Sequence, residues 1–125
     1  MPRVMIVDDE PYIVKSVKTI LEKEGYSVVG AESGDDCLKK LEKEPVDLIL
    51  MDFFMPGMDG RAVIERIREN PDLKSTKIAF LTSASFREKG LEILDVLGVS
   101  DYIVKPIEVH NFTSKIKKIF KNNEK

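Results

Sequence analysis

Five short apolar segments alternate with amphipathic segments along this chain, and no other feature constrains its fold as strongly. The apolar segments span residues 4–7, 26–29, 46–52, 78–81 and 101–104. Their apolar residues are continuous rather than alternating, which is typical of strands buried on both faces of a parallel sheet. We therefore predict five parallel strands that lie between two layers of helices.

The segments that follow the strands have the three- and four-residue apolar spacing of amphipathic helices. Pro, Ser and Gly mark where these helices begin or end. The predicted helices run from Pro11 to Gly25, from Ser33 to Pro45, from Ala62 to Asn70, from Ser85 to Gly98, and from beyond Pro106 to about residue 121. The last helix is expected to bury a stripe of Val109, Phe112, Ile116, Ile119 and Phe120.

This order of elements predicts an α/β fold, a (βα)5 three-layer sandwich. Right-handed crossovers leave few strand orders, and the flavodoxin-like order 2-1-3-4-5 is among them. A chain of 125 residues has the usual length of one domain. We assign residues 1–121 to that domain and residues 122–125 to a polar tail.

Composition excludes several classes of protein. The formal net charge of -2 argues against a nucleic-acid-binding surface, which needs a basic excess. The single Cys37 rules out an intramolecular disulfide and fits a reducing compartment. No signal peptide is recognised, and no apolar run approaches the roughly 20 residues of a membrane span. We expect a cytoplasmic protein without direct nucleic-acid contact or membrane insertion.

Residues with distinctive chemistry follow or end four of the predicted strands. Asp8 and Asp9 follow the first strand, Asp52 ends the third, Thr82 follows the fourth and Lys105 follows the fifth. Because ligands of open parallel sheets bind beyond the carboxyl ends of the strands, we expect these side chains to converge at one edge.

The chemistry of this set favours magnesium and phosphate. Three neighbouring carboxylates repel one another unless a cation lies among them. Mg²⁺ binds a few carboxylate oxygens together with waters and phosphoryl oxygens. Phosphoryl transfer depends mainly on positioning and charge neutralisation, and an aspartate can act as the nucleophile. The sequence therefore places Asp52 at the centre of a phosphoryl-transfer site.

The same residues resemble those of a known family. The motifs are Asp8-Asp9, Asp52 at the end of an apolar strand, Met55-Pro56-Gly57-Met58-Asp59-Gly60, Thr82-Ser83-Ala84 and Lys105-Pro106. Over residues 3–121 the chain is similar to the receiver domain of two-component response regulators, especially the single-domain chemotaxis type.

The resemblance implies that Asp52 accepts a phosphoryl group from a histidine kinase or phosphotransfer protein. It implies Mg²⁺ bound by Asp9, Asp52 and the backbone carbonyl of Phe54, with Asp8 acting through water. Thr82 and Lys105 would hold the phosphoryl oxygens. Such a protein is a phosphoacceptor switch that catalyses its own phosphorylation and dephosphorylation.

The resemblance also implies how the signal is passed on. Tyr102 occupies the family's switch-aromatic position and would move with Thr82. The Lys105-Pro106 bond is a candidate cis peptide, because the free-energy cost of the cis isomer is small before proline. A downstream protein would bind the face formed by the fourth helix, fifth strand and fifth helix. The expected state is a monomer or a weak phosphorylation-dependent dimer.

Two positions depart from the family pattern. Side chains two residues beyond the phosphorylated aspartate and two beyond the threonine commonly orient the hydrolytic water, and here they are Phe54 and Ala84. Neither side chain can hydrogen-bond a water. Our hypothesis is that shielding by Phe54 governs loss of the phosphoryl group and favours a long-lived signal.

Simpler readings exist for several residues. Asp8-Asp9 alone would serve as a helix cap, His110 is expected to be solvated, and Cys37 is expected to pack in a helix. The cations of the last helix fit either a docking patch or the helix dipole. These are Lys115, Lys117, Lys118 and Lys121.

Other functional classes stay as alternatives. An aspartyl-nucleophile phosphohydrolase needs a second carboxylate two residues after the first, where Phe54 stands. A flavin-binding flavodoxin needs a Ser/Thr/Gly-rich phosphate loop, which the first strand-to-helix turn lacks. Within the leading interpretation the chain is a stand-alone regulator or the excised receiver of a longer one. The absence of a linker-like tail favours the first.

Overall fold

The computed structural model describes residues 2–52, 60–73, 75–82, 98–99 and 101–122, and the side chains of Thr82 and Asn122 are not described. Its elements are β1 (Arg3–Val7), α1 (Pro11–Lys23), β2 (Ser27–Ala31), α2 (Gly34–Lys43), β3 (Leu48–Asp52), α3 (Gly60–Glu69), a 3-10 turn (Pro71–Leu73), β4 (Lys77–Thr82), β5 (Asp101–Val104) and α5 (Val109–Asn122). All strand pairs are parallel, in the order β2-β1-β3-β4-β5. The predicted sheet and its strand order are confirmed.

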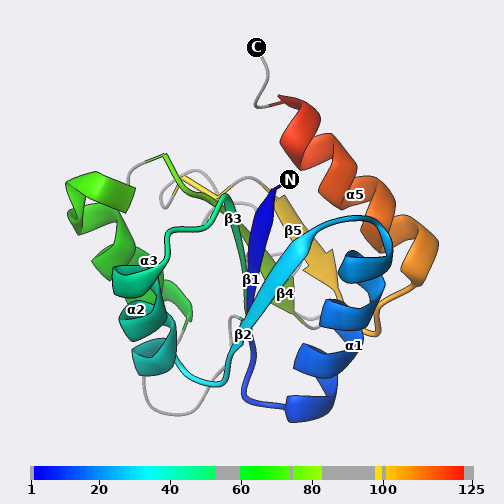
Figure 1. The fold of residues 1–125 in the computed structure, drawn as a ribbon, viewed down its shortest axis with the longest axis horizontal. Coiled ribbons are helices and arrows are strands. Elements are labelled where there is room, and N and C mark those ends of the chain that lie inside the picture. Colours follow the sequence, from blue (N-terminus) through cyan, green and yellow to red (C-terminus); the bar gives the residue numbers. More distant parts are fainter. Residues whose placement is uncertain (1, 53–59, 74, 83–97, 100, 123–125) are drawn as a thin grey trace.

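The sheet lies between two helical layers, with α2 and α3 on one face and α1 and α5 on the other (Figure 1). Successive strand residues point to opposite faces, so both faces of each inner strand are buried. Met5, Ile49 and Phe80 belong to the core under α2 and α3. Ile6 and Leu50 belong to the core under α1 and α5. This two-sided burial explains why the apolar runs are continuous.

Local sequence accounts for the helix ends. Pro11 opens α1, and Gly25, with φ at 93°, follows it in the left-handed region that glycine tolerates. The Ser33 hydroxyl accepts a hydrogen bond from the Asp36 amide at 3.0 Å, as expected of the cap of α2. A Cβ placed on Gly30 would lie 2.6 Å from Val14 Cγ1. Only glycine therefore lets α1 pack this closely on β2.

Two predicted strands differ at their ends from those observed. β2 begins at Ser27 rather than Tyr26 and continues to Ala31. The Tyr26 ring instead stacks on Phe120 of α5, with ring centroids 5.5 Å apart. β3 begins at Leu48 rather than Val46. Just before it, the Asp47 carboxylate accepts a hydrogen bond from the Arg3 amide at 2.8 Å.

The buried stripe of the last helix was predicted wrongly at one residue. Phe112, Ile116 and Ile119 are buried, and Phe120 packs against them, but Val109 is 54% exposed. Val109 is the first residue of α5, where a groove separates α5 from α1, so its side chain has little to pack against. α5 also includes Asn122, which the sequence assigned to the tail.

Some predictions concern residues outside those described. They include most of the helix expected between Ser85 and Gly98, and Asp59 as a helix cap. Gly98 itself has φ at 65°, as expected of a glycine that ends a helix.

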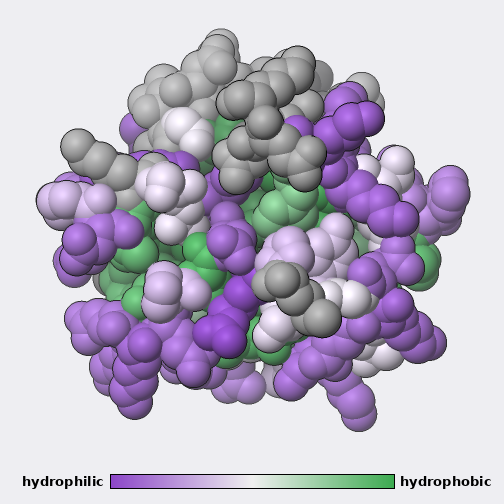
Figure 2. Space-filling view, turned by 45° about the horizontal axis from the view of Figure 1, so that its top comes forward, coloured by the Kyte–Doolittle hydropathy of each residue, from purple (hydrophilic) through white to green (hydrophobic). Residues whose placement is uncertain are grey.

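Among the described helices, none is long and apolar enough to cross a membrane. Figure 2 turns the end where the strands begin toward the viewer, and hydrophilic side chains there surround smaller hydrophobic areas.

Candidate phosphoryl-transfer site

Strand register brings the predicted site residues together. Val7 of β1 lies opposite Met51 of β3, so the next residues, Asp8 and Asp52, are neighbours at the carboxyl edge of the sheet. β4 and β5 end side by side, and Lys105 follows β5 at that edge. The parallel topology thus assembles a site from residues far apart in the sequence.

The side chain of Lys105 joins the two buried carboxylates. Its ammonium donates to Asp8 Oδ2 at 2.8 Å and lies 3.7 Å from Asp52 Oδ2. Asp8 is fully buried, Asp52 is 4% exposed, and the Lys105 side chain is 19% exposed. A third carboxylate, that of Glu10, lies 3.7 Å from the same nitrogen. Lys105 therefore supplies the positive charge that buried carboxylates require.

The pKa of Lys105 reflects two opposing effects. Burial alone lowers the pKa, because it disfavours the charged ammonium. The hydrogen bond to Asp8 and the charges of Asp52, Asp8 and Glu10 outweigh burial, so the pKa lies above its ordinary value of 10.5. Lys105 is accordingly a cation at neutral pH.

An acidic group adjoins this lysine. Asp8, Asp9 and Glu10 each offer a carboxylate oxygen within 4.8 Å of the others. The Glu10 amide donates to Asp8 Oδ1 at 2.9 Å, which fixes the turn between β1 and α1. Hard carboxylate oxygens in this arrangement suit Mg²⁺, which prefers oxygen ligands. Lys105 connects Asp52 to this group, because its ammonium contacts Asp8 and Glu10 as well as Asp52.

Glu10 was not among the predicted site residues. It directly continues the acidic pair and precedes Pro11, at the cap position of α1, where its side chain makes no cap hydrogen bond. The signal that identifies it is the unbroken triplet Asp8-Asp9-Glu10 between a strand and a helix. The pKa of the exposed Tyr12 hydroxyl is raised, chiefly by hydrogen bonding with Glu10 and by the negative charge of that carboxylate.

The structure brings together Asp8, Asp9, Asp52 and Lys105. Thr82 ends β4 beside Val104, although its side chain is not described. The Lys105-Pro106 peptide bond is cis, the isomer that the resemblance implies. Phe54 and Ala84, to which the metal-ligand prediction and the hypothesis of a long-lived signal refer, lie outside the described residues.

The structure also shows where the residues with simpler interpretations lie. His110 is exposed in the first turn of α5, and Cys37 is fully buried, which raises the pKa of its thiol to about 12. Lys117 pairs at 3.2 Å with Glu24, the residue that follows α1. Lys115 binds Tyr102 and Asp101 of β5.

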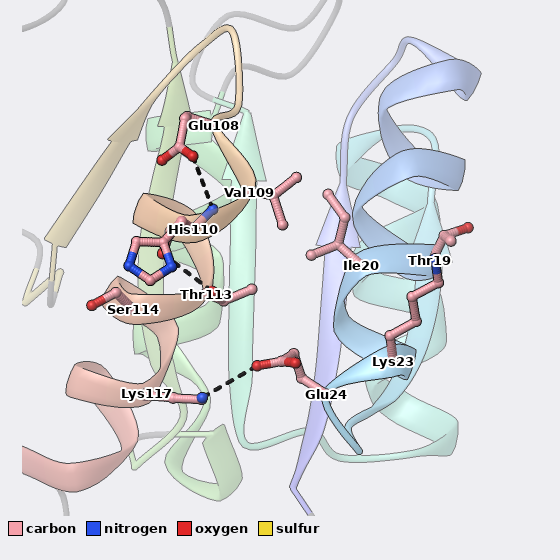
Figure 3. Close-up of a pocket in the computed structure, with 10 residues that line it drawn as sticks. All are labelled: Thr19, Ile20, Lys23, Glu24, Glu108, Val109, His110, Thr113, Ser114 and Lys117. Atoms are coloured by element: carbon pink, nitrogen blue, oxygen red, sulfur yellow. Dashed lines mark hydrogen bonds and ion pairs between the residues drawn. The ribbon is translucent and has the colours of Figure 1, made fainter.

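A groove of about 640 Å³ lies between α1 and α5 (Figure 3). Ile20 and Lys23 line it from α1, and Val109, His110 and Lys117 line it from α5. None of its lining residues belongs to the acidic group or is Asp52 or Lys105. The groove contains carboxylates of its own, Glu24 and Glu108, but not the buried pair that Lys105 joins. We therefore place the candidate site at the carboxyl edge of the sheet.

Residues 4–117 match the family described as "Response regulator receiver domain". The chain belongs to this family, since the match covers most of its length. The fold and the strand-end residues agree with that assignment.

Solved structures show the same fold at moderate identity. The chemotaxis protein CheY4 of Vibrio cholerae is 30% identical with a TM-score of 0.88, over 95% of this chain and 98% of that one. The response regulator TrrA of Thermotoga maritima, solved in complex with Mg(2+)-BeF, is 35% identical with a TM-score of 0.81, over 95% and 99%.

Curated relatives include longer proteins. The transcriptional regulatory protein ResD of Bacillus subtilis is 34% identical, over 95% of this chain and 48% of its own length. The sensor protein GacS of Pseudomonas syringae is 39% identical, over 85% of this chain and 12% of its own length. The chain spans about half the length of the first curated relatives it matches.

Proposed function

We propose that this chain is the phosphoacceptor of a phosphorelay and that Asp52 accepts the phosphoryl group. The observation that carries the proposal is the Lys105 ammonium between the buried Asp8 and Asp52 carboxylates. A nearly buried carboxylate beside a fixed cation and an acidic group is positioned to attack phosphorus while the charge on the transferred oxygens is neutralised.

The donor is a histidine kinase or a phosphotransfer protein. A carboxylate oxygen of Asp52 attacks the phosphorus of a phosphohistidine, a P–O bond forms, and the P–N bond breaks with its electron pair on the imidazole. The product is an acyl phosphate on Asp52. Lys105 then pairs with the phosphoryl oxygens, together with Thr82.

The acidic group fits Mg²⁺, which in TrrA accompanies a beryllium fluoride group. Asp9, Asp52 and the backbone carbonyl of Phe54 would hold the ion, with Asp8 acting through water and Glu10 beside them. The ion supplies positive charge that offsets the carboxylates and the phosphoryl oxygens. Lys105 provides part of this charge from the protein itself.

Phosphorylation would change a protein-binding surface rather than begin turnover of a substrate. Thr82 and Tyr102 would respond to the phosphoryl group and alter the face that includes β5 and α5. A downstream protein then binds this face. The chain works in the cytoplasm, either alone or as the receiver of a longer regulator. Relatives about twice its length support the second arrangement.

The test uses Mg²⁺ and acetyl phosphate with detection by intact mass. The wild-type chain is expected to gain one phosphoryl group, and Asp52→Asn none. Asp35→Asn is the matched control, because Asp35 is an exposed aspartate in the first turn of α2. Labelling of Asp52→Asn to the wild-type extent refutes the proposal.

A further inference from the structure

Tyr102 lies at the open edge of the sheet, and its backbone is held there by side chains. β5 is the outer strand, so one side of its backbone has no neighbouring strand among the described elements. The Tyr102 amide donates to Asp101 Oδ1 at 2.7 Å, and the Tyr102 carbonyl accepts from Lys115 Nζ at 3.0 Å. Both backbone groups of this one residue are thus satisfied by side chains.

The same lysine also contacts the Tyr102 ring. Lys115 Nζ lies 5.3 Å from the ring centroid, within the range of a cation–π interaction. It lies 4.0 Å from Asp101 Oδ1, the atom that accepts the Tyr102 amide. The Lys115 side chain is 30% exposed, so water screens these contacts only in part. One ammonium therefore links the carbonyl, the ring and the neighbouring carboxylate.

From this geometry we infer that Lys115 is a positioning residue for Tyr102. The ammonium holds the half-buried ring in the orientation observed, because rotation of the ring away from Nζ gives up the cation–π contact. This inference rests on the proposed function, in which Tyr102 reorients after phosphorylation of Asp52. Lys115 then sets how readily the ring changes orientation, and α5 takes part in the switch through this contact.

A purely structural role makes a different prediction. Charged side chains at an edge strand block pairing with another chain, and Asp101 of β5 together with Lys115, which reaches this edge from α5, would have that effect. Loss of these charges would promote association between chains but leave the orientation of the Tyr102 ring unchanged. A measurement on the ring itself therefore separates the two roles.

The experiment observes Tyr102 by ¹⁹F NMR of protein that contains 3-fluorotyrosine. Tyr12→Phe and Tyr26→Phe leave Tyr102 as the single reporter, since the chain has three tyrosines. In this background we compare Lys115 with Lys115→Met, Lys115→Gln and Lys115→Arg. Gln keeps a donor for the carbonyl without the charge, and Arg keeps both. Lys118→Met, an exposed lysine of the same helix, is the control.

Lys115→Met and Lys115→Gln are expected to displace or split the Tyr102 resonance. The expected change is roughly two- to fivefold in the ratio of ring orientations, the amount a cation–π contact supports. Lys115→Arg and Lys118→Met are expected to keep the parent resonance. A parent-like resonance in both Lys115→Met and Lys115→Gln overturns the inference, as does an equal displacement by Lys118→Met.

A second measurement relates the ring to the phosphoryl group. The same samples receive Mg²⁺ and acetyl phosphate, and intact mass gives the labelled fraction. At equal labelling, the fraction of Tyr102 in its new position is expected to differ at least about twofold between parent and Lys115→Met, as follows from the same contact. Equal fractions contradict a role for Lys115 in the switch. Absence of labelling in the parent instead contradicts the proposed function, and the comparison of unlabelled rings still tests Lys115.

Discussion

Lys105 and Lys115 carry the same ammonium group in two very different settings. Lys105 lies at the carboxyl edge of the sheet among Asp8, Asp52 and Glu10, and its side chain is 19% exposed. Lys115 extends from α5 to the outer edge of β5, where it meets one carbonyl, one ring and a carboxylate at 4.0 Å. The first lysine neutralises buried negative charge, whereas the second holds a neighbouring residue.

This difference shows what a cation contributes in each place. Removing a charge from among buried carboxylates leaves them uncompensated, which is costly. Removing a partly exposed cation loses only modest contacts, because water replaces much of the interaction. We therefore expect the loss of Lys105 to lower the free energy of unfolding more than the loss of Lys115, and by an amount that depends on Mg²⁺. The loss of Lys115 should affect the orientation of the Tyr102 ring more than stability.

Lys105→Met is expected to have the largest effect. It leaves Asp8 and Asp52 without the ammonium between them, and we expect a loss of about 2–3 kcal/mol in the free energy of unfolding when a chelator is present. Mg²⁺ should recover much of this loss, because the ion offsets the same carboxylates. Urea denaturation with chelator and with Mg²⁺ measures both quantities. Wild-type stability of the variant in chelator contradicts the assigned role.

The same contribution has a defined pH range. The pKa of Lys105 is raised in the folded protein above its ordinary value of 10.5. The stabilisation is therefore fully present below that value and is lost as the pH rises further. The difference in stability between wild type and Lys105→Met should stay constant from neutral pH to about 10 and shrink at higher pH. A difference that shrinks below about pH 9 would argue against this ion pair.

Gly30→Ala should destabilise the protein by a similar amount for an unrelated reason. The added Cβ would lie 2.6 Å from Val14 Cγ1, and overpacking of this kind costs about 1–3 kcal/mol. Because the contact involves no charge, Mg²⁺ should stabilise this variant no more than the wild type. Val14→Ala in the same chain should recover part of the loss. A specific rescue by Mg²⁺ would show that the metal response of Lys105→Met is not electrostatic.

Lys115→Met should cost only about 0.5–1 kcal/mol, since a partly exposed cation–π contact and ion pair contribute on this scale. The loss should be the same with chelator and with Mg²⁺, in contrast to Lys105→Met. Urea denaturation under both conditions makes the comparison. A loss as large as that of Lys105→Met would remove the distinction between the two lysines.

Glu10→Gln should produce the smallest change in stability, no more than about 0.5 kcal/mol, because Glu10 is partly exposed and 3.7 Å from Lys105. Its clearest effect is on Tyr12, whose raised pKa should move back toward 10.0 when the charge is removed. A spectrophotometric titration in a Tyr26→Phe, Tyr102→Phe background isolates Tyr12. An unchanged pKa would exclude the contact between Glu10 and Tyr12.

The sequence was sufficient to predict the strand ends of the site. Asp8, Asp52 and Lys105 follow apolar runs, and parallel topology requires that such runs end at one edge. The handedness of crossovers then reduced the possible strand orders to a few, and the observed order is one of them. These features depend on backbone geometry that local patterns specify.

Side-chain contacts between distant elements were not predictable in the same way. The sequence does not show that Lys115 binds the carbonyl of Tyr102, because that contact depends on how α5 passes the edge of β5. Val109 fits a helical apolar stripe, yet its exposure depends on the groove beside α1. Glu10 could have been included, since its place beside Asp9 is visible in the sequence.

The most direct test of the central proposal asks which aspartate carries the phosphoryl group. Borohydride reduces an aspartyl phosphate to homoserine, so reduction after labelling with Mg²⁺ and acetyl phosphate marks the modified residue for peptide mapping. We predict homoserine at residue 52 and unmodified aspartates at residues 8 and 9. Homoserine at residue 8 or 9 in place of residue 52 would contradict it.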